Sequence, residues 1–496
     1  MVSSLLFALL LAQAVAPAPE TPDTKAAETK SADAKPAEKT ADKEEPPVVT
    51  HHEIHVGGKA LKYTVTTGLM PLRDAKGDVE AHIFFIAYTL DGVGETSQRP
   101  LMFSFNGGPG SASVWLHLGA IGPKRVMVLP DGRMPAPPFH LVDNEYTWLD
   151  QTDLVFIDPV GTGYSRAAKP ELGKKFWSVN GDVESVGEFI RLYLTRYERW
   201  TSPLFLVGES YGTTRAAGLS GYLIERGIAF NGIVLVSSIL NFETVQFTKG
   251  NDLPYVLYLP SYAATAWYHH KLAPELQSDL PKTLKEVEAW AATDYAAALA
   301  KGDRLTTGLS KSYIDESNLR VSIFPFTKEL LRDERRTVGR LDSRFKGIDE
   351  SAATAEPEYD PTIAAVRPPY TTTFNNYVRG ELGYKTDLEY YILGGGITSP
   401  WDWGSGFPDT SDDLRQAFAK NPYMKLYVAS GHFDLATPYF ATQYTLAHMG
   451  LDPTQRQNIR TGEYEAGHMM YVDTSQLEKL KREVATFVAG TLGGEK

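Results

Sequence analysis

The sequence predicts an α/β fold with a mostly parallel central sheet, on three observations. Between about residues 100 and 240, short apolar runs alternate with stretches of helical periodicity, as expected for parallel strands covered on both faces by helices. Ahead of them, residues 48–90 alternate between polar and apolar side chains, which is typical of antiparallel hairpins at the edge of a sheet. Residues 241–400 break this rhythm and are mainly helical, which indicates an insertion.

The most informative segment is G-E-S-Y-G at residues 208–212. It follows the apolar run 203–207 and precedes a segment of helical character, 213–226. A strand, a sharp turn with a serine between two glycines, and a helix together form the nucleophile elbow of an α/β-hydrolase. Glycines suit both flanks because the turn is crowded. We therefore predict an α/β-hydrolase fold with Ser210 as the nucleophile.

The expected strands fall into two groups that differ in pattern. The first group alternates in polarity and has glycine-containing turns at 57–58 and 76–78, so it predicts hairpins. The second group consists of short, continuously apolar runs, as in strands buried on both faces. The first group comprises 54–56, 61–65 and 81–88, and the second comprises 100–105, 154–158, 203–207, 232–236 and 425–429.

Apolar residues at helical spacing predict helices at 183–200 and 282–300, and a last helix that starts at Ser475. The run Ser475-Gln476-Leu477-Glu478 fits a capping box at the start of this last helix. A proline-containing stretch late in the insertion is expected to be a loop, because proline interrupts helices. Its prolines are Pro357, Pro361, Pro368 and Pro369.

Residues 1–16 resemble a secretory signal peptide, with an apolar core and A-x-A cleavage sites. Residues 17–47 consist of Ala, Pro, Thr, Ser, Lys, Asp and Glu, so they cannot bury apolar surface and are expected to be a disordered tether. The catalytic domain is then assigned to 48–240 and 401–496, and the cap insertion to 241–400.

The composition argues against a nucleic-acid-binding protein and favours an exported one. The 496 residues carry a net charge of −12, which argues against a nucleic-acid partner. The chain has no cysteine, so an exported form would be held together by core burial alone. We expect a bacterial exported protein, periplasmic or extracellular, with no stable membrane insertion after signal cleavage. Composition leaves the oligomeric state open.

A serine nucleophile needs a base, and the base needs an orienting carboxylate. In this fold the chain order is Ser, then Asp or Glu, then His, each on a loop after a strand. His468 lies just ahead of the last predicted helix, and Asp434 directly follows the strand that ends at residue 429. The predicted triad is therefore Ser210, Asp434 and His468. His432 is a rival base, but it shares a loop with Asp434.

The segment F-N-G-G-P-G at residues 105–110 directly follows a central strand. In α/β-hydrolases a loop at this place supplies one backbone N–H of the oxyanion hole, and the residue after the nucleophile supplies the other. Here that second residue is Tyr211. A plain tight turn is the alternative interpretation, but the density of glycine and proline favours a loop of close approach.

Metal chemistry has one weak candidate. On a strand, His51, Glu53 and His55 would share a face. They lie on an edge strand beside the tether and far from the predicted catalytic residues, so exposed polar side chains that bind no metal are the better interpretation. No metal and no cofactor are expected to take part in the reaction.

Taken together, these segments resemble the serine carboxypeptidase family, peptidase family S10. The similarity is carried by five blocks in family order that span about residues 60 to 490. The blocks are N-G-G-P-G-S at 106–111, N-E-Y-T-W at 144–148, F-I-D-P-V-G-T-G-Y-S at 156–165, G-E-S-Y-G at 208–212 and A-G-H-M at 466–469.

The resemblance implies a serine carboxypeptidase that releases C-terminal residues from peptides with a free C-terminus, through an acyl-enzyme. It also implies that the oxyanion is held by the amides of Gly108 and Tyr211. Asn106 and Glu209 match family positions that bind the terminal carboxylate of the substrate. Because an ionised Glu209 would repel that carboxylate, we expect activity to favour acidic pH.

The chain departs from the family at several points. Many members carry a second glutamate near the carboxylate site, ahead of a Gly-Pro pair, and Ala120 occupies that position here. The acid preference is therefore expected to be weaker. Family disulfides that brace the insertion are absent because there is no cysteine. The insertion itself barely matches, so preferences for substrate side chains do not carry over.

Three other functions are compatible with parts of the sequence. Prolyl aminopeptidases have a similar Gly-Gly-Pro-Gly loop, but Asn106 and Glu209 count against them. An esterase or acyltransferase on the same scaffold would use the same acyl-enzyme. A non-catalytic envelope binding protein would be expected to lack part of the predicted triad.

Overall fold

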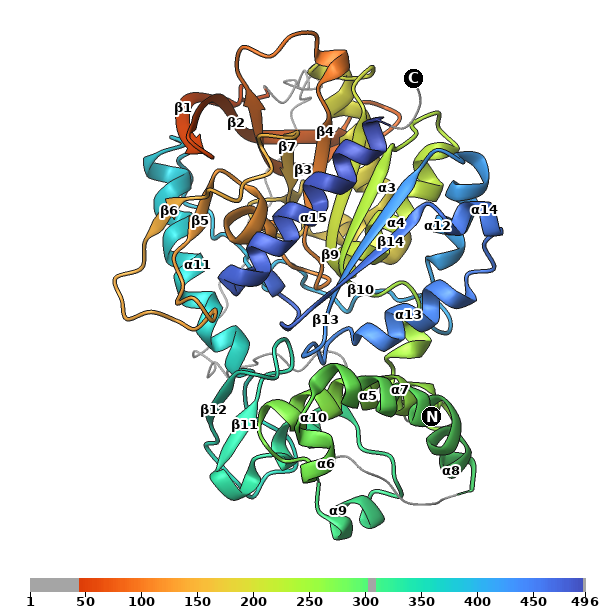
Figure 1. The fold of residues 1–496 in the computed structure, drawn as a ribbon. Helices are drawn as coiled ribbons and strands as arrows, with labels where there is room; N and C mark the ends of the chain where they lie inside the picture. Colours follow the sequence, from red (N-terminus) through yellow and green to blue (C-terminus); the bar gives the residue numbers. More distant parts are fainter. Residues whose placement is uncertain (1–43, 302–308, 494–496) are drawn as a thin grey trace, which may run out of the picture. The chain divides into compact units, whose positions relative to one another are not determined.

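A ten-stranded sheet organises the chain in the computed structural model, which describes residues 44–301 and 309–493 (Figure 1). Its order is β1-β2-β3-β7-β4-β9-β10-β13-β14, with β8 paired to β3. The strands are β1 (Val48–Val56), β2 (Lys59–Arg73), β3 (Val79–Leu90), β4 (Leu101–Phe105), β7 (Asp153–Ile157), β8 (Arg166–Ala167), β9 (Leu204–Ser210), β10 (Gly232–Ser238), β13 (Lys425–Gly431) and β14 (Ile459–Tyr464).

The sheet has an antiparallel edge and a parallel remainder. Strands β1, β2, β3 and β7 pair antiparallel, whereas β7-β4, β4-β9, β9-β10, β10-β13 and β13-β14 are all parallel. The predicted fold class is thereby confirmed: a mostly parallel sheet with N-terminal hairpins at one edge. Parallel strands end at the same edge of a sheet, so the loops after β4, β9, β10, β13 and β14 lie together.

Helices cover both faces of the sheet. In β3, Phe84 and Ile86 enter the core cluster shared with α11 (Pro361–Gly380) and α15 (Thr474–Gly493). Ile83 and Phe85 enter the cluster shared with α3 (Val179–Arg196), α4 (Tyr211–Ile224) and α12 (Ser411–Lys420). This period-two alternation follows from strand geometry. The helices outside the insertion are α1 (Val114–Leu116), α2 (Gly173–Phe176), α3 (Val179–Arg196), α4 (Tyr211–Ile224), α12 (Ser411–Lys420), α13 (Tyr439–His448), α14 (Pro453–Arg456) and α15 (Thr474–Gly493).

The insertion is mainly helical, as predicted, and it lies beyond the carboxyl ends of β9, β10 and β13 in Figure 1. The predicted helix 282–300 is a continuous helical stretch made of α7, a π-turn and α8. The elements between β10 and α12 are α5 (Leu253–Tyr268), α6 (Pro274–Gln277), α7 (Leu280–Trp290), α8 (Ala296–Lys301), α9 (Lys311–Glu316), α10 (Ile323–Glu329), β11 (Arg336–Val338), β12 (Lys346–Ile348) and α11 (Pro361–Gly380).

The predicted proline loop is wrong for most of its length, because α11 begins at Pro361 and continues through Pro368 and Pro369. Proline is well tolerated in the first turn of a helix, and the Asp360 carboxylate caps this end by accepting from Thr362 N at 2.8 Å. The two internal prolines cost helix hydrogen bonds. Burial of one face of α11 in the main core, including Tyr370, offsets that cost.

The last helix also starts differently from the prediction. It begins at Thr474, and the Asp473 carboxylate accepts from Ser475 N at 3.0 Å and from Gln476 N at 3.4 Å. Asp473 is therefore the cap, and the predicted capping box at Ser475 is wrong. An aspartate one residue ahead of the helix satisfies the first amides as well as a serine does.

The domain boundaries remain predictions. The chain divides into two units between Glu45 and Pro46. The predicted signal peptide, 1–16, and all but the last four residues of the predicted tether, 17–47, lie outside the described residues. The part of the insertion from α5 to β11 packs in clusters separate from the two clusters of the sheet, with Leu435 joining one of them, whereas α11 belongs to the core of the sheet. Within the described residues, no helix is both long and apolar enough to span a membrane.

Candidate active site

Ser210 occupies a strained turn between β9 and α4. Its backbone has φ 60° and ψ −132°, a conformation that non-glycine residues rarely adopt. A Cβ on Gly208 would lie 2.2 Å from Gly212 O, and one on Gly212 would lie 3.0 Å from Phe105 O. Both flanking glycines are therefore required by close approach of the backbone, and the serine stands at the carboxyl edge of the sheet.

Asp434 and His468 follow the ends of two neighbouring parallel strands, β13 and β14, and their side chains meet. His468 Nδ1 lies 2.7 Å from Asp434 Oδ2, and both side chains are buried. Thr437 donates from its hydroxyl to Asp434 Oδ2 at 2.8 Å, while the amides of Ala436 and Thr437 donate to Oδ1. Every oxygen of this carboxylate is thus engaged, which fixes its orientation toward the imidazole.

Burial by itself would lower the pKa of His468. The Asp434 carboxylate, hydrogen-bonded to the ring, outweighs burial and leaves the pKa of His468 above its usual value. A histidine held in this way keeps Nδ1 as the donor to the carboxylate and leaves Nε2 free to accept a proton.

A loop of the insertion holds the histidine and aspartate loops in place. This loop joins β11 to β12. His468 N donates to Leu341 O at 2.6 Å, Gly467 N donates to Asp342 Oδ2 at 3.0 Å, and Leu435 N donates to Arg340 O at 3.0 Å. Residues far apart in sequence therefore brace the backbone on which the pair is mounted.

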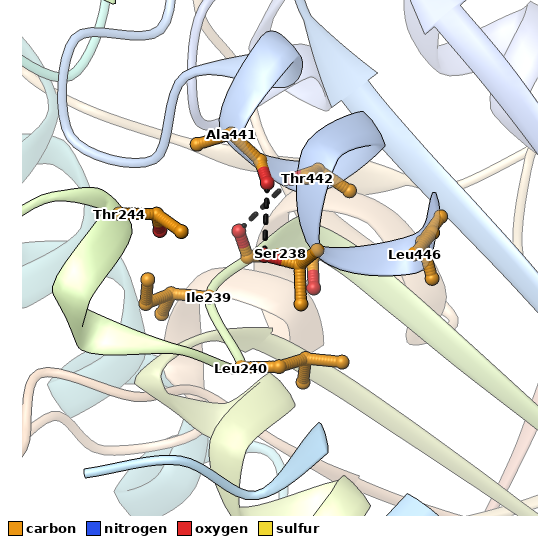
Figure 2. A pocket seen from close by; sticks show the side chains of 8 residues that line it. Ser238, Ile239, Leu240, Thr244, Ala441, Thr442 and Leu446 are labelled. Carbon is orange, nitrogen blue, oxygen red and sulfur yellow. Dashed lines mark hydrogen bonds between the residues drawn. The ribbon is translucent and has the colours of Figure 1, made fainter. Parts of the chain in front are cut away.

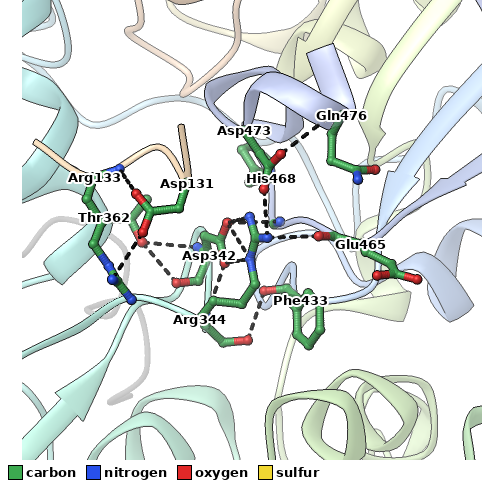
Figure 3. A network of polar contacts seen from close by, with 12 residues as sticks. Asp131, Arg133, Asp342, Arg344, Thr362, Phe433, Glu465, His468, Asp473 and Gln476 are labelled. Carbon is green, nitrogen blue, oxygen red and sulfur yellow. Dashed lines mark hydrogen bonds and ion pairs between the residues drawn. The ribbon is translucent and has the colours of Figure 1, made fainter. Parts of the chain in front are cut away.

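Arg344 completes this bracing network, shown in Figure 3. Its guanidinium lies 2.7 Å from Asp342 Oδ2 and 3.2 Å from Asp473 Oδ2, and it donates to Glu465 O at 2.8 Å. The side chains of Arg344 and Asp342 are 12% and 2% exposed. Because both charges are nearly buried, removing one would leave the other without compensation.

The loop after β4 packs directly against the turn that carries Ser210. A Cβ on Gly107 would lie 2.4 Å from Tyr211 N, so only glycine allows this approach. Arg215, fully buried in α4, donates to Asn106 O at 2.7 Å and pairs with Asp182 at 2.7 Å. Tyr211 N is a first-turn amide of α4 and so has no acceptor within the helix.

Beside the same turn lies a cluster of buried polar groups that lack partners. Asn106 accepts from Leu116 N at 3.0 Å through Oδ1, which leaves Nδ2 as a free donor. Asn106 Nδ2, Glu209 Oε2 and Tyr471 Oη are all buried without a hydrogen bond in the described part of the chain. Buried polar atoms are usually paired, and each unpaired one costs about 1–3 kcal/mol.

Burial raises the pKa of Glu209 to about 7, against the opposing influence of the nearby His468. The carboxyl group is therefore largely neutral in mildly acidic solution and can act as a hydrogen-bond donor. Ala120, 0% exposed, adds no second carboxyl group here.

The other histidines considered in the sequence have separate surroundings. His432 Nε2 lies 3.1 Å from Glu463 Oε2 instead of facing Asp434. In β1, His51 and His55 are exposed, and His51 Nδ1 lies 3.0 Å from Thr64 Oγ1. Within residues 44–301 and 309–493, no group of three or more His, Asp or Glu side chains could hold a metal ion.

A small pocket lies next to the end of β10 (Figure 2). Ser238 pairs in register with Ser210, and Thr442 donates to Ser238 O at 3.1 Å across the pocket. None of the predicted catalytic side chains takes part in the lining. The lining residues are Ser238, Ile239, Leu240, Thr244, Ala441, Thr442, Thr445 and Leu446.

Comparison with known proteins adds three findings. A family model described as serine carboxypeptidase matches residues 58–482. Serine carboxypeptidase-like 13 of Arabidopsis thaliana is 27% identical over 195 residues, 38% of this chain and 42% of that protein. The pheromone-processing carboxypeptidase KEX1 of Saccharomyces cerevisiae is 34% identical over 158 residues, 29% of this chain and 20% of that protein. Each alignment spans less than half of the relative's own length.

A solved structure shares the fold. The prohormone-processing carboxypeptidase Kex1(delta)p from Saccharomyces cerevisiae matches with a TM-score of 0.52 and 18% sequence identity. The match covers 86% of this chain and 91% of the other. The common architecture therefore extends over most of both chains.

Proposed function

The chain belongs to the serine carboxypeptidase family, and from this premise we propose that it releases C-terminal residues from peptides as a serine-type carboxypeptidase. The observation that carries the proposal is the buried pair Asn106 and Glu209 beside Ser210. An unpaired amide donor and a carboxyl group of raised pKa suit the recognition of a substrate carboxylate.

In the proposed reaction, Ser210 Oγ attacks the carbonyl carbon of the last peptide bond, and His468 Nε2 takes the hydroxyl proton. Asp434 holds the imidazole and stabilises its charged form. The tetrahedral intermediate collapses as His468 passes the proton to the leaving amine. Water then resolves the acyl-enzyme by the same steps, with His468 again as the base.

We assign the oxyanion to the amides of Gly108 and Tyr211. The close packing of the loop after β4 on the turn at Ser210 supports this assignment. The loss of one such donor typically costs about 10²–10³ in turnover. The substrate's terminal carboxylate is assigned to Asn106 Nδ2 and to protonated Glu209.

Export to the periplasm or the cell exterior is part of the proposal, supported by the signal-like sequence of residues 1–16. Fractionation of cells that express the chain with and without these residues tests this part. Retention of both forms in the cytoplasm would contradict it.

Mass spectrometry of N-blocked peptides, each with a free or an amidated C-terminus, tests the proposed activity. We expect stepwise loss of C-terminal residues from the free acids and none from a Ser210→Ala variant. Cleavage of esters alone, or transfer to an alcohol, would indicate an esterase or an acyltransferase. Absence of both cleavage and fluorophosphonate labelling would indicate a binding protein.

A further inference from the structure

Tyr471 is the one member of the unpaired cluster that the sequence did not single out. It lies in the short helix η7 (Met470–Val472), three residues after His468, and is 2% exposed. A buried tyrosine nearly always pairs its hydroxyl, because the ring is apolar and the oxygen is not. Tyr471 Oη lies beside Glu209 and Asn106, and within the described residues Tyr471 Oη, Glu209 Oε2 and Asn106 Nδ2 make no hydrogen bond of standard geometry, so these atoms are available to a group that enters from outside.

Close contacts along one edge of the Tyr471 ring hold the ring against Gly119. A Cβ on Gly119 would lie 2.5 Å from Tyr471 Cε2 and 2.5 Å from Tyr370 Oη. The two rings thus fill the space above Gly119, next to Ala120, which offers no polar group of its own.

Glu209 and Asn106 also lie close enough to Tyr471 to shift its ionisation. Burial, followed by the negative charge of Glu209, raises the pKa of Tyr471 well above its usual value. The phenol therefore stays protonated, and hence a donor, throughout the pH range in which a histidine base can work.

We propose that Tyr471 is a specificity-determining residue that donates its hydroxyl to the C-terminal carboxylate of the substrate, as a third donor beside Asn106 Nδ2 and protonated Glu209. This inference rests on the proposed carboxypeptidase function. A tyrosine keeps its proton at neutral pH, where a carboxyl group loses it. The site is thereby able to retain free-acid substrates above the pH at which Glu209 ionises.

The test compares wild type with Tyr471→Phe, which removes only the hydroxyl. Blocked peptides with free and with amidated C-termini are assayed between pH 5 and 8. We expect kcat/KM for the free acids to fall about tenfold to a hundredfold, with kcat/KM for the amides unchanged. Tyr377→Phe is the matched control, because Tyr377 is buried in the same core and bonds Tyr88 at 3.1 Å.

A second readout separates recognition from a merely structural effect. Tyr471 lies close enough to Glu209 for its hydroxyl to favour the ionised carboxylate, so removal of the hydroxyl should raise the pKa of Glu209. The pH at which KM for free acids begins to rise should therefore move upward in Tyr471→Phe and stay in place in Tyr377→Phe.

Two results would overturn the inference. If Tyr471→Phe keeps the wild-type ratio of acid to amide cleavage and the same pH break, Tyr471 does not bind the carboxylate, while the proposed function stands. If wild type itself cleaves acids and amides equally well, the proposed function fails and the role of Tyr471 fails with it.

Discussion

The two halves of the candidate site differ in how completely the protein satisfies its own polar groups. On one side, the Asp434 carboxylate receives two backbone amides, a hydroxyl and the imidazole of His468. In the other half, Asn106, Glu209 and Tyr471 each keep a buried polar atom that has no hydrogen-bond partner among the described residues. The polar groups of the first half are satisfied within the protein, and we propose that a bound substrate carboxylate satisfies those of the second half.

This difference fits a division of labour between chemistry and recognition. A base must have a fixed orientation before the substrate arrives, because reorganisation during the reaction would raise the barrier. A subsite for a carboxylate must instead leave donors free, and their unmet hydrogen bonds favour binding of a group that accepts them. In the proposed function, Asp434 and His468 meet the first requirement, and Asn106, Glu209 and Tyr471 meet the second.

Replacing Ser210 with alanine should give the largest effect, because it removes catalysis and leaves the proposed carboxylate-binding residues in place. We expect turnover of free-acid peptides to fall by about 10⁴–10⁶, because the nucleophile is lost. Calorimetry should show that the variant still binds these peptides more tightly than their amides, since the carboxylate cluster is untouched. Residual turnover near the wild-type level would contradict the assignment of Ser210.

Asp434→Asn disrupts only the half of the site that contains Asp434 and His468. An asparagine amide donates where the carboxylate accepts, so His468 is held in the wrong tautomer, and turnover should fall by about 10⁴. Steady-state kinetics with acid and amide peptides should show both substrates affected equally. A loss confined to free acids would contradict the division between the halves.

Arg344→Ala tests how far the stability of the loops that carry Asp434 and His468 depends on contacts with the insertion. The change leaves Asp342 buried without its countercharge, and we expect the free energy of unfolding to fall by about 3–5 kcal/mol. The matched control is Arg415→Ala, which breaks an exposed pair with Asp412 and should cost about 0–1 kcal/mol. Urea denaturation of both variants measures the difference, and equal losses would show that the bracing adds nothing.

Glu209→Gln is expected to change the kinetics least, and it tests the half of the site that contains Asn106, Glu209 and Tyr471. The wild-type carboxyl group, with a pKa of about 7, donates when protonated and repels the substrate when ionised. KM for free acids should therefore rise above that pKa in wild type, by less than tenfold per pH unit because Asn106 and Tyr471 still donate. The glutamine does not ionise, so its KM should stay flat from pH 5 to 8. A wild-type KM that is flat over the same range would contradict the role of Glu209.

The sequence predicted what local patterns determine. The turn at Ser210 could be predicted from the sequence because backbone contacts in and around the turn require its two flanking glycines. Asp434 and His468 are visible because the fold puts such residues after the last two strands. Their mutual contact, 34 residues apart in sequence, was inferred from the fold and is not readable from spacing alone.

The residues that the sequence did not reveal depend on contacts between distant segments. Asp342 meets Gly467 across 125 positions, and Arg215 meets Asn106 across 109. Tyr471 appears in sequence as one more aromatic residue near the last helix, and only the packing over Gly119 brings it to Glu209. The helix through Pro368 was missed because tertiary burial overrides a poor local propensity.

The most direct test of the account is the rate at which wild type removes the last residue from a peptide with a free C-terminus, compared with its amide, at mildly acidic pH. We predict rapid release from the free acid and at most slow release from the amide, because the proposed donors recognise a carboxylate. Equal rates on both peptides would contradict the central claim that Asn106, Glu209 and Tyr471 recognise the chain terminus.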